Sequence, residues 1–303
     1  MTRLRIATRG SELALVQAAL VAEAVTLSAR PSAISFELVV VETAGDVQRE
    51  RPIGEIGGQG VFVKEVEQAL LEERADLAVH SAKDLPSVSG ADGLCIVAVP
   101  ERGDPRDALV GLPMGELGPG ARVASGAPRR RAQLAWLRPD LRFQELRGNI
   151  ATRLAKVPEG GAVVVAYAAL QRLGLAEMAA EVLSLSTMMP QVGQGALAVQ
   201  CRAGDSFTAE VIALIDHEDS HRCLDAERAF LAELGGGCEL PVGAHGVVVA
   251  DGSLELEGLV ASPDGLVLLR RALHGTEPVE IGRALAKELL ERCGGAEILL
   301  GTA

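Results

Sequence analysis

The chain has 303 residues, a mass of 31.5 kDa and a formal net charge of −12, and 48% of its residues are hydrophobic. This length favours two or three domains, and the composition is typical of a folded α/β protein rather than a disordered chain. The acidic balance argues against a nucleic-acid or membrane-surface partner, and no apolar stretch reaches the roughly 18–20 residues that span a bilayer.

Strands and helices alternate over the first hundred residues. Ser11 is a suitable helix N-cap between a short apolar run and an Ala/Leu/Val-rich segment. The predicted elements are strands over 4–8, 34–43 and 77–81, a helix after Ser11, a glycine-rich loop over 57–60 and a helix from about Phe62 to Arg74. This alternation favours a mainly parallel, doubly wound sheet, which binds ligands outside the carboxyl ends of its strands.

The same plan repeats from Arg122 onwards. The predicted strands are residues 122–125, 141–146 and 162–167, with polar turns and helices between them. The repeat predicts two similar α/β lobes with a cleft between them. The segment Met189–Gly195 is then predicted to cross back to the first lobe, which gives a two-strand hinge.

The last third of the chain has a different pattern. A helix over about 220–234 ends at three glycines, and three strand-like runs follow, separated by the turns Asp251-Gly252 and Asp264-Gly265. A terminal helix over about 280–292 is predicted to close the chain. These features predict a small α+β domain.

Arginines are concentrated where strands end or helices begin. Arg129, Arg130 and Arg131 open a predicted helix directly after the turn Ser125-Gly126-Ala127-Pro128. Further arginines at comparable places are Arg147, Arg153 and Arg172. A guanidinium group matches a carboxylate or a phosphate, and a helix N-terminus adds partial positive charge. The pattern predicts a small polyanionic ligand in an interdomain cleft; a solvated basic face is the alternative for the triplet.

Two residues lie at positions where a catalytic group is expected. Asp84 lies beside Lys83 at the mouth of a predicted strand, where a carboxylate can stabilise a cationic intermediate or accept a proton. A surface ion pair is the alternative. Cys238 follows three glycines and precedes Glu239, so we expect a loop thiol, which is a potential nucleophile. An incidental loop cysteine explains the same position equally well.

The other cysteines and the histidines point to no further chemistry. The five cysteines include no C-x-x-C pair, which favours reduced thiols in the cytoplasm, and Cys95, Cys201 and Cys293 lie in or beside apolar runs where inert residues are expected. The first ten residues do not have the pattern of a secretory signal, so a cytoplasmic protein is predicted. His217, His221 and Cys223 have a spacing that zinc could use, but no fourth ligand is near in sequence, and we predict no metal site.

The chain resembles the porphobilinogen deaminase (hydroxymethylbilane synthase) family over essentially its full length. Each matching stretch is weak by itself, but their number and order are specific. The matching stretches are RIATRGSELALVQA (5–18), GGQGVFVKE (57–65), ADLAVHSAKDLPS (75–87), RGDPRDALV (102–110), RRRAQL (129–134), LRGNIATRL (146–154), LQRLGL (170–175), VGQGAL (192–197) and GGGCELPVG (235–243).

The resemblance implies a three-domain protein whose first two domains are similar to periplasmic binding protein lobes. The corresponding boundaries here are residues 1–99 with 193–216, residues 100–192, and residues 217–303. It also implies a dipyrromethane cofactor joined by a thioether to the loop cysteine, here Cys238. A transferase of this family condenses four porphobilinogen molecules with release of ammonia and frees the linear tetrapyrrole hydroxymethylbilane. Porphobilinogen carries two carboxylates, so the growing chain becomes increasingly anionic.

The resemblance also implies roles for individual residues. Asp84 matches the catalytic aspartate, which stabilises the positive charge formed when ammonia leaves. The positions that match cofactor-binding residues are Cys238, Lys83, Ser81, Arg129, Arg130, Ser125 and Phe62, and those that match substrate-binding residues are Arg9, Ser11, Gln17, Arg147, Arg153 and Arg172. Arg131 falls where the family need not have a cation. A monomer is the expected state.

The chain departs from the family pattern at a few positions. Two serines are frequent in the family where Gly126 and Ala127 stand, and lysines are common at Gln59 and near Glu55. Backbone N–H groups of Gly126 and Ala127 could replace the lost hydroxyl contacts as an anion nest. The alternative function, from a different class, is a non-catalytic two-lobed protein that binds a small anion.

Overall fold

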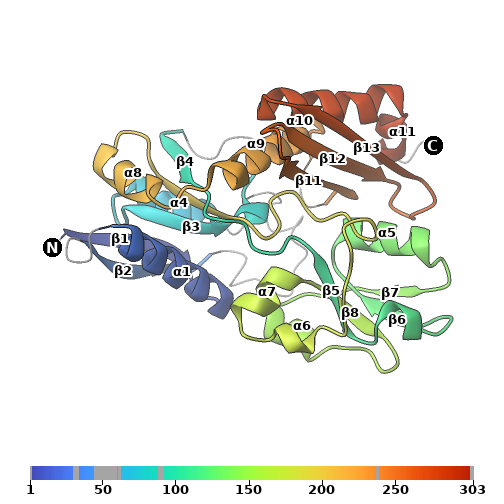
Figure 1. The fold of residues 1–303 in the computed structure, drawn as a ribbon. Coiled ribbons are helices and arrows are strands. Elements are labelled where there is room, and N and C mark those ends of the chain that lie inside the picture. The colour runs from blue at the N-terminus through green and yellow to red at the C-terminus, as the bar shows by residue number, and fades with distance from the viewer. Residues whose placement is uncertain are drawn as a thin grey trace. The chain divides into compact units, whose positions relative to one another are not determined.

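The computed structural model describes residues 2–29, 34–43, 60, 63–87, 92–236 and 239–300. Phe62 and Cys238, two of the predicted site residues, lie outside the described residues, as do Glu55 and Gln59. The chain divides into two compact units, Met1–Gly103 with Ala196–His221 and Asp104–Gly195 with Arg222–Ala303. The first unit contains one five-stranded sheet, and the second contains a five-stranded and a three-stranded sheet (Figure 1).

The first unit is built on a five-stranded sheet of order β2-β1-β3-β10-β4. Its strands are β1 (Thr2–Arg9), β2 (Ile34–Val41), β3 (Leu77–Ser81), β4 (Leu94–Ala98) and β10 (Leu197–Arg202), and its helices are α1 (Glu12–Ser28), α4 (Lys64–Leu71) and α8 (Ser206–Ala213). Strand β1 pairs in parallel with β2 and β3, whereas β10 is antiparallel to both β3 and β4. The mainly parallel sheet predicted for this part of the chain is confirmed.

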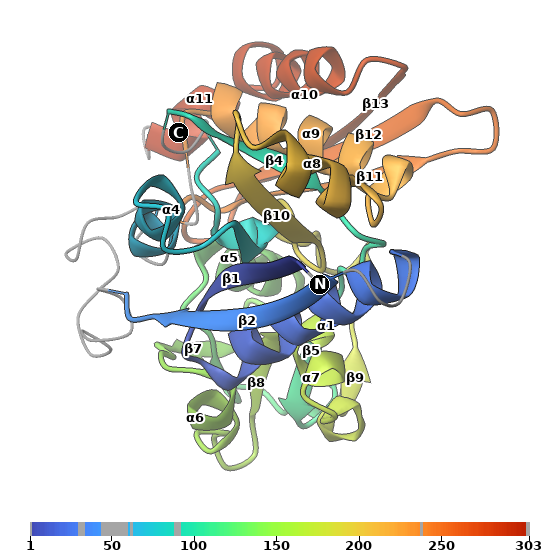
Figure 2. The same ribbon diagram turned by 90° about the vertical axis from the view of Figure 1, so that its left-hand side faces the viewer.

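Alternation along the strands gives this sheet two apolar faces. Ile6 and Leu77 belong to the hydrophobic cluster that includes α1 and α8, whereas Ala7 and Ala78, their neighbours in sequence, pack with α4. Because successive side chains of a strand point to opposite faces, the helices cover both sides of the sheet. Figure 2 shows α1 lying along the β1–β2 side. The carboxyl ends of β1 and β3 are thereby left for a site.

The second unit contains a sheet of the same plan, in the order β7-β6-β8-β5-β9. Its strands are β5 (Asp107–Gly111), β6 (Arg122–Ala124), β7 (Arg142–Gln144), β8 (Ala162–Ala166) and β9 (Glu181–Val182), with helices α5 (Pro128–Leu137), α6 (Ile150–Leu154) and α7 (Tyr167–Arg172) and short 3-10 turns at Met114–Glu116 and Ala176–Met178. Strands β7, β6 and β8 are parallel neighbours, and β5 is antiparallel to β8 and β9. Two lobes of the same doubly wound plan are therefore confirmed.

The connections between the two sheets explain their reversed strands. The chain leaves the first sheet after β4 and enters the second as β5, and it leaves the second after β9 and returns as β10. After each crossing, the strand by which the chain enters the sheet, β5 or β10, runs antiparallel to both of its neighbours. The predicted return over Met189–Gly195 lies in the second crossing. That the crossings act as a hinge stays a prediction.

A smaller antiparallel sheet, β11-β12-β13, completes the second unit. Its elements are β11 (Val242–Val248), β12 (Leu254–Ala261), β13 (Leu268–Gly275), α9 (Glu218–Glu233), α10 (Pro278–Lys287) and α11 (Gly295–Leu300). Helices α10 and α11 lie over one face of this sheet (Figure 1). Leu259 and Ala261 of β12 pack with Ala132 of α5 and with Met189, so this sheet and the lobe sheet share apolar contacts within the unit. The division into three domains stays a prediction.

The predicted elements match the observed ones with few exceptions. The strand over 77–81 has the predicted limits, and the helix expected over 62–74 is the shorter α4. The helix predicted over 280–292 is present, as α10 followed directly by the π-helical turn Glu288–Arg292. It does not close the chain as expected, because Gly294, at φ 78°, separates it from a further helix, α11 (Gly295–Leu300). Within the described residues, no helix is both long and apolar enough to cross a membrane.

Candidate functional site

Several predicted site residues surround one small cavity of about 60 Å³ in the first unit. They come from the carboxyl ends of β1 and β3 and from the first turns of α1. The predicted residues that line it are Arg9, Ser11, Gln17, Ser81 and Asp84, and His80 lies among them. The sheet edge predicted from strand–helix alternation is therefore the place where these side chains meet.

Local structure fixes the polar groups of this Asp84 cavity. The Ser11 side chain caps α1 by accepting a hydrogen bond from the Ala14 N–H at 3.3 Å, as predicted. Buried Gln17 donates through Nε2 to Ser81 Oγ at 2.9 Å, which joins α1 to the end of β3. The next residues form a 3-10 turn, Ala82–Asp84, and the Ala82 N–H donates to the Ala196 carbonyl at 3.0 Å. Asp84 thus stands on a turn anchored to the sheet.

Lys83 and His80 lie near Asp84 in sequence but differ in their relation to the cavity. Lys83 lies on the same turn as Asp84 but is not among the residues that line the cavity. His80 is only 6% exposed, and burial, with a smaller contribution from Arg9, lowers its pKa to about 4. Its imidazole is therefore neutral at physiological pH, so Arg9 supplies positive charge beside the Asp84 carboxylate and His80 does not.

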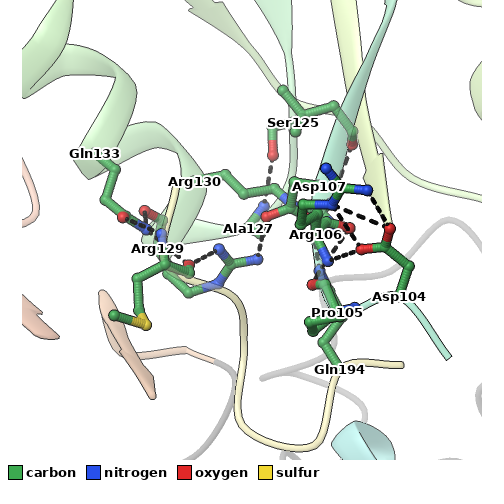
Figure 3. Close-up of polar contacts among 12 residues, drawn as sticks. Asp104, Pro105, Arg106, Asp107, Ser125, Ala127, Arg129, Arg130, Gln133 and Gln194 are labelled. Atoms are coloured by element: carbon green, nitrogen blue, oxygen red, sulfur yellow. Dashed lines mark hydrogen bonds and ion pairs between the residues drawn. The ribbon is translucent and has the colours of Figure 1, made fainter. Parts of the chain in front are cut away.

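A second group of predicted residues forms a buried cluster in the second unit. Arg129 and Arg130, at the start of α5, are 3% and 5% exposed, and both bind the fully buried carboxylate of Asp107 on β5 (Figure 3). Arg129 Nη2 donates to Asp107 Oδ2 at 2.8 Å, and Arg130 donates to Oδ1 through Nη2 at 2.7 Å and Nε at 3.1 Å. Arg129 also donates to the Met189 carbonyl, and Arg130 to the Val164 carbonyl at 3.0 Å.

Asp107 is the electrostatic centre of this arginine cluster. Burial by itself would raise the pKa of Asp107, but Arg129 and Arg130, with the amide of Gln194, hold it well below its usual range. Gln194 Nε2 lies 2.8 Å from Asp107 Oδ1 and 2.7 Å from the Pro105 carbonyl, so the cluster also joins the two crossing segments. Two guanidinium groups share one carboxylate, and this set of three ionic groups carries a net positive charge.

The turn before the arginine pair accounts for one departure from the family pattern. A Cβ atom at Gly126 would lie 2.6 Å from the Leu146 carbonyl oxygen, so no larger residue fits the observed backbone. The Ala127 N–H donates to Ser125 Oγ at 3.2 Å. The expected anion nest is therefore wrong for Ala127, because its N–H already has an internal acceptor. Arg131 forms an exposed pair with Glu145, which agrees with a surface role.

The remaining predicted arginines lie elsewhere in the second unit. Arg153, on α6, donates through Nε to the Gly148 carbonyl at 2.8 Å, and Arg147 precedes this turn. Arg172 ends α7 and donates through Nη2 to the Gly195 carbonyl at 2.6 Å. Burial lowers the pKa of Arg172 to about 10, and no carboxylate among the described residues pairs with it. A half-buried cation of this kind is suited to an anionic ligand.

The second unit also contains a small recess beside the start of α5. Its lining includes Arg129 and Ala127 together with the apolar residues Leu231, Leu240 and Val242. Leu240 is two residues after Cys238 in sequence. An arginine and apolar side chains together are suited to a carboxylate-bearing ring.

Comparison with known proteins assigns the chain to a family. The sequence model described as porphobilinogen deaminase, dipyromethane cofactor binding domain, matches residues 4–210, and the model of the porphobilinogen deaminase C-terminal domain matches residues 221–291. The chain belongs to the porphobilinogen deaminase family. The family resemblance expected from the nine sequence stretches is thereby confirmed.

Curated members of the porphobilinogen deaminase family align with the chain almost end to end. The porphobilinogen deaminase of Roseiflexus castenholzii is 44% identical over 98% of this chain and 99% of its own length. That of Syntrophotalea carbinolica is 45% identical over 98% and 95%. Among solved structures, a TRAP periplasmic solute binding protein from Desulfovibrio salexigens aligns at a TM-score of 0.41 with 10% identity, covering 72% of this chain and 73% of its own.

Some residues of this family member were not predicted to matter. Asp107 and Gln194 are far from the arginines in sequence, and their only signal was their place in the stretches RGDPRDALV and VGQGAL.

The three residues with a zinc-like spacing have other local surroundings. The Ser220 N–H donates to His217 Nδ1 at 3.2 Å, His221 Nδ1 lies 2.8 Å from Asp216 Oδ1, and Cys223 is buried. The described residues contain no group of three potential metal ligands.

Proposed function

We propose that the chain is the transferase of tetrapyrrole biosynthesis that joins four porphobilinogen molecules head to tail, releases ammonia at each addition and yields hydroxymethylbilane. The observation that carries the proposal is the Asp84 cavity. In a member of this family, a carboxylate, an arginine and four neutral hydrogen-bonding side chains converge at one sheet edge.

Each polar group of the Asp84 cavity has a role in this proposal. The Asp84 carboxylate stabilises the positive charge that develops on the pyrrole of porphobilinogen as ammonia leaves. Arg9 binds a substrate carboxylate, and Ser11 and Gln17 orient the same side chain by hydrogen bonds. Because Gln17 and Ser81 are already bonded to each other, they offer a fixed arrangement to the substrate rather than one formed on binding.

The second unit supplies the remaining carboxylate partners. We assign Arg147, Arg153 and Arg172 to the acetate and propionate groups of substrate and growing chain. Arg172 is the best supported of the three, because burial lowers its pKa and a bound carboxylate would restore it.

The dipyrromethane cofactor would be held through a thioether at Cys238. Arg129 fits it, because this arginine lines the same recess as Leu240 and belongs to a cluster with net positive charge. Further holding residues in the proposal are Arg130, Ser125, Lys83, Ser81 and Phe62. When bound, the cofactor supplies the pyrrole carbon to which the first substrate unit is joined.

Two measurements test the proposal. Purified protein incubated with porphobilinogen should release ammonia and a linear tetrapyrrole, whereas a non-catalytic anion-binding protein would bind porphobilinogen without releasing ammonia. The intact mass should exceed the sequence mass by two pyrrole units, and Cys238→Ser should remove this excess. An unmodified protein with full activity would refute the thioether.

The organisation of the protein is part of the same proposal. Three domains with a two-strand hinge at the crossings would let the lobes adjust as the chain grows. A monomeric state, a cytoplasmic location and the absence of nucleic-acid and membrane partners are further parts of the proposal, and the formal net charge of −12 disfavours binding to polyanionic surfaces. Sedimentation at several concentrations tests the monomer.

A further inference from the structure

Three buried polar side chains form a row that ends at the Asp84 cavity, where His80 is part of the lining. Glu67 on α4, Gln200 on β10 and His80 on β3 are all at least nine-tenths buried, on the face of the sheet where Ala78 packs with α4. Buried polar groups cost free energy unless they are paired. Three such side chains beside the apolar cluster of Ala78 and α4 therefore call for an explanation.

The hydrogen bonds of this row define how the side-chain amide of Gln200 is oriented. Gln200 Nε2 donates to Glu67 Oε1 at 3.2 Å, so the amide oxygen of Gln200 points away from the carboxylate. Gln200 lies close enough to interact with the His80 ring, but neither Gln200 Oε1 nor His80 Nε2 has a hydrogen bond of ordinary geometry within the described part of the chain. An amide oxygen can only accept, so it favours the imidazole tautomer that carries its proton on Nε2. In that tautomer Nδ1 has the free electron pair.

We propose that His80 is a further binding residue of the Asp84 cavity, whose imidazole accepts a hydrogen bond through Nδ1 from an N–H group of the molecule bound there. The inference rests on the proposed function, in which that molecule is a pyrrole with an aminomethyl group. Glu67 and Gln200 are positioning residues, because they set the tautomer and the ring orientation of His80 without lining the cavity.

The charges of the cavity favour this assignment. An uncharged imidazole beside Asp84 adds an acceptor without adding a positive charge, which would repel an ammonium or a positively charged pyrrole. Arg9 disfavours protonation of His80 and so maintains this state. The cavity then presents two acceptors for N–H groups, Asp84 and His80, and one cation for carboxylates.

The test compares His80→Phe, which keeps a ring and removes both nitrogens, with His274→Phe, the same change at an exposed residue of the other unit. We expect kcat/KM for porphobilinogen to fall by about 10-fold or more in His80→Phe and to be unchanged in His274→Phe. His80→Gln, which keeps an acceptor, should recover part of the loss. A His80→Phe protein with kcat/KM equal to that of His274→Phe would overturn the proposal. If His80→Phe does not fold, kcat/KM of His80→Gln and the ¹⁵N-imidazole NMR spectrum test the proposal instead.

Nitrogen NMR gives a readout that a purely structural role would not move. The chain has five histidines, so the ¹⁵N-imidazole spectrum is simple and the His80 signals are those absent from the His80→Gln protein. We expect a neutral ring protonated on Nε2, and a shift of Nδ1 when porphobilinogen is added to Asp84→Asn protein. Glu67→Gln should change the tautomer ratio. An Nδ1 signal that does not respond overturns the proposal, whereas a wild-type protein that releases no ammonia overturns the proposed function and leaves the Nδ1 test valid.

Discussion

Replacing Asp107 by asparagine should destabilise the second unit more than any other single change in the arginine cluster. The substitution keeps the size of the side chain and removes only its charge. One oxygen acceptor is retained, but the other becomes an NH₂ group that faces a guanidinium group. Arg129 and Arg130 would then be buried as two cations with no anion between them.

The expected magnitude follows from this burial. Removing one partner of a buried ion pair typically costs about 3–5 kcal/mol, because the remaining charge stays out of water without compensation. Asp107 serves two guanidinium groups and the Gln194 amide at 2.7–3.1 Å, so we expect a loss in that range from the free energy of unfolding. A matched change in the exposed Arg131–Glu145 pair, Glu145→Gln, should cost about 1 kcal/mol or less.

Urea unfolding followed by tryptophan fluorescence is the appropriate measurement. Trp136 is the only tryptophan of the chain, it lies on α5 with both arginines, and it is 51% exposed, so its emission reports on the unit that is perturbed. An Asp107→Asn protein whose unfolding free energy falls no more than that of Glu145→Gln would refute the assignment of Asp107 as the counter-ion.

The same comparison has a defined pH dependence. The pKa of Asp107 is depressed in the folded state, so the unfolded state binds the proton more readily, and the stabilisation is complete above the unfolded pKa of about 3.9. It is lost as the pH falls through the folded pKa. The advantage of wild type over Asp107→Asn should therefore be constant from pH 7 to about 5 and shrink below about 4.

Three further predictions concern activity and the turn before the arginines. Asp84→Asn should lower ammonia release by roughly 10²–10⁴-fold with an unchanged urea midpoint; near wild-type turnover would remove Asp84 from the catalytic role. Arg172→Gln should raise KM about 10–100-fold without lowering the melting temperature, because a half-buried cation with a lowered pKa is costly to the fold; an unchanged KM would contradict its substrate role. Gly126→Ser should cost about 1–3 kcal/mol, measured through Trp136, because its Cβ would meet the Leu146 carbonyl; a neutral effect would show that the turn has room.

Features that depend on neighbouring residues were predictable from the sequence. Ser11 caps α1 because the hydroxyl and the N–H that it satisfies are three residues apart. The strand over 77–81 was located by its apolar run and flanking polar residues, so Asp84 could be placed at its carboxyl end. The position of Asp84 at a sheet edge followed from the general arrangement of strands and helices in doubly wound folds.

Long-range pairing was not predictable in the same way. The reversed strands β5 and β10 were not foreseen, because each is delivered to its sheet by a crossing from the other sheet rather than by a local turn. The helix that follows Gly294 was also missed, since the apolar pattern of residues 280–292 does not show that the chain continues as a helix beyond a glycine.

The sequence by itself determined the family, the two-lobed α/β plan and the residue types of the site, because family motifs, caps and strand periodicity are local in the chain. Only the tertiary structure decided which charges are paired. The arginine pair at the start of α5 was expected to meet a ligand, and it is bound internally by Asp107, 22 residues away from Arg129 in sequence. Burial and ion pairing depend on which distant segments the sheets bring together, so they become visible only in the folded molecule.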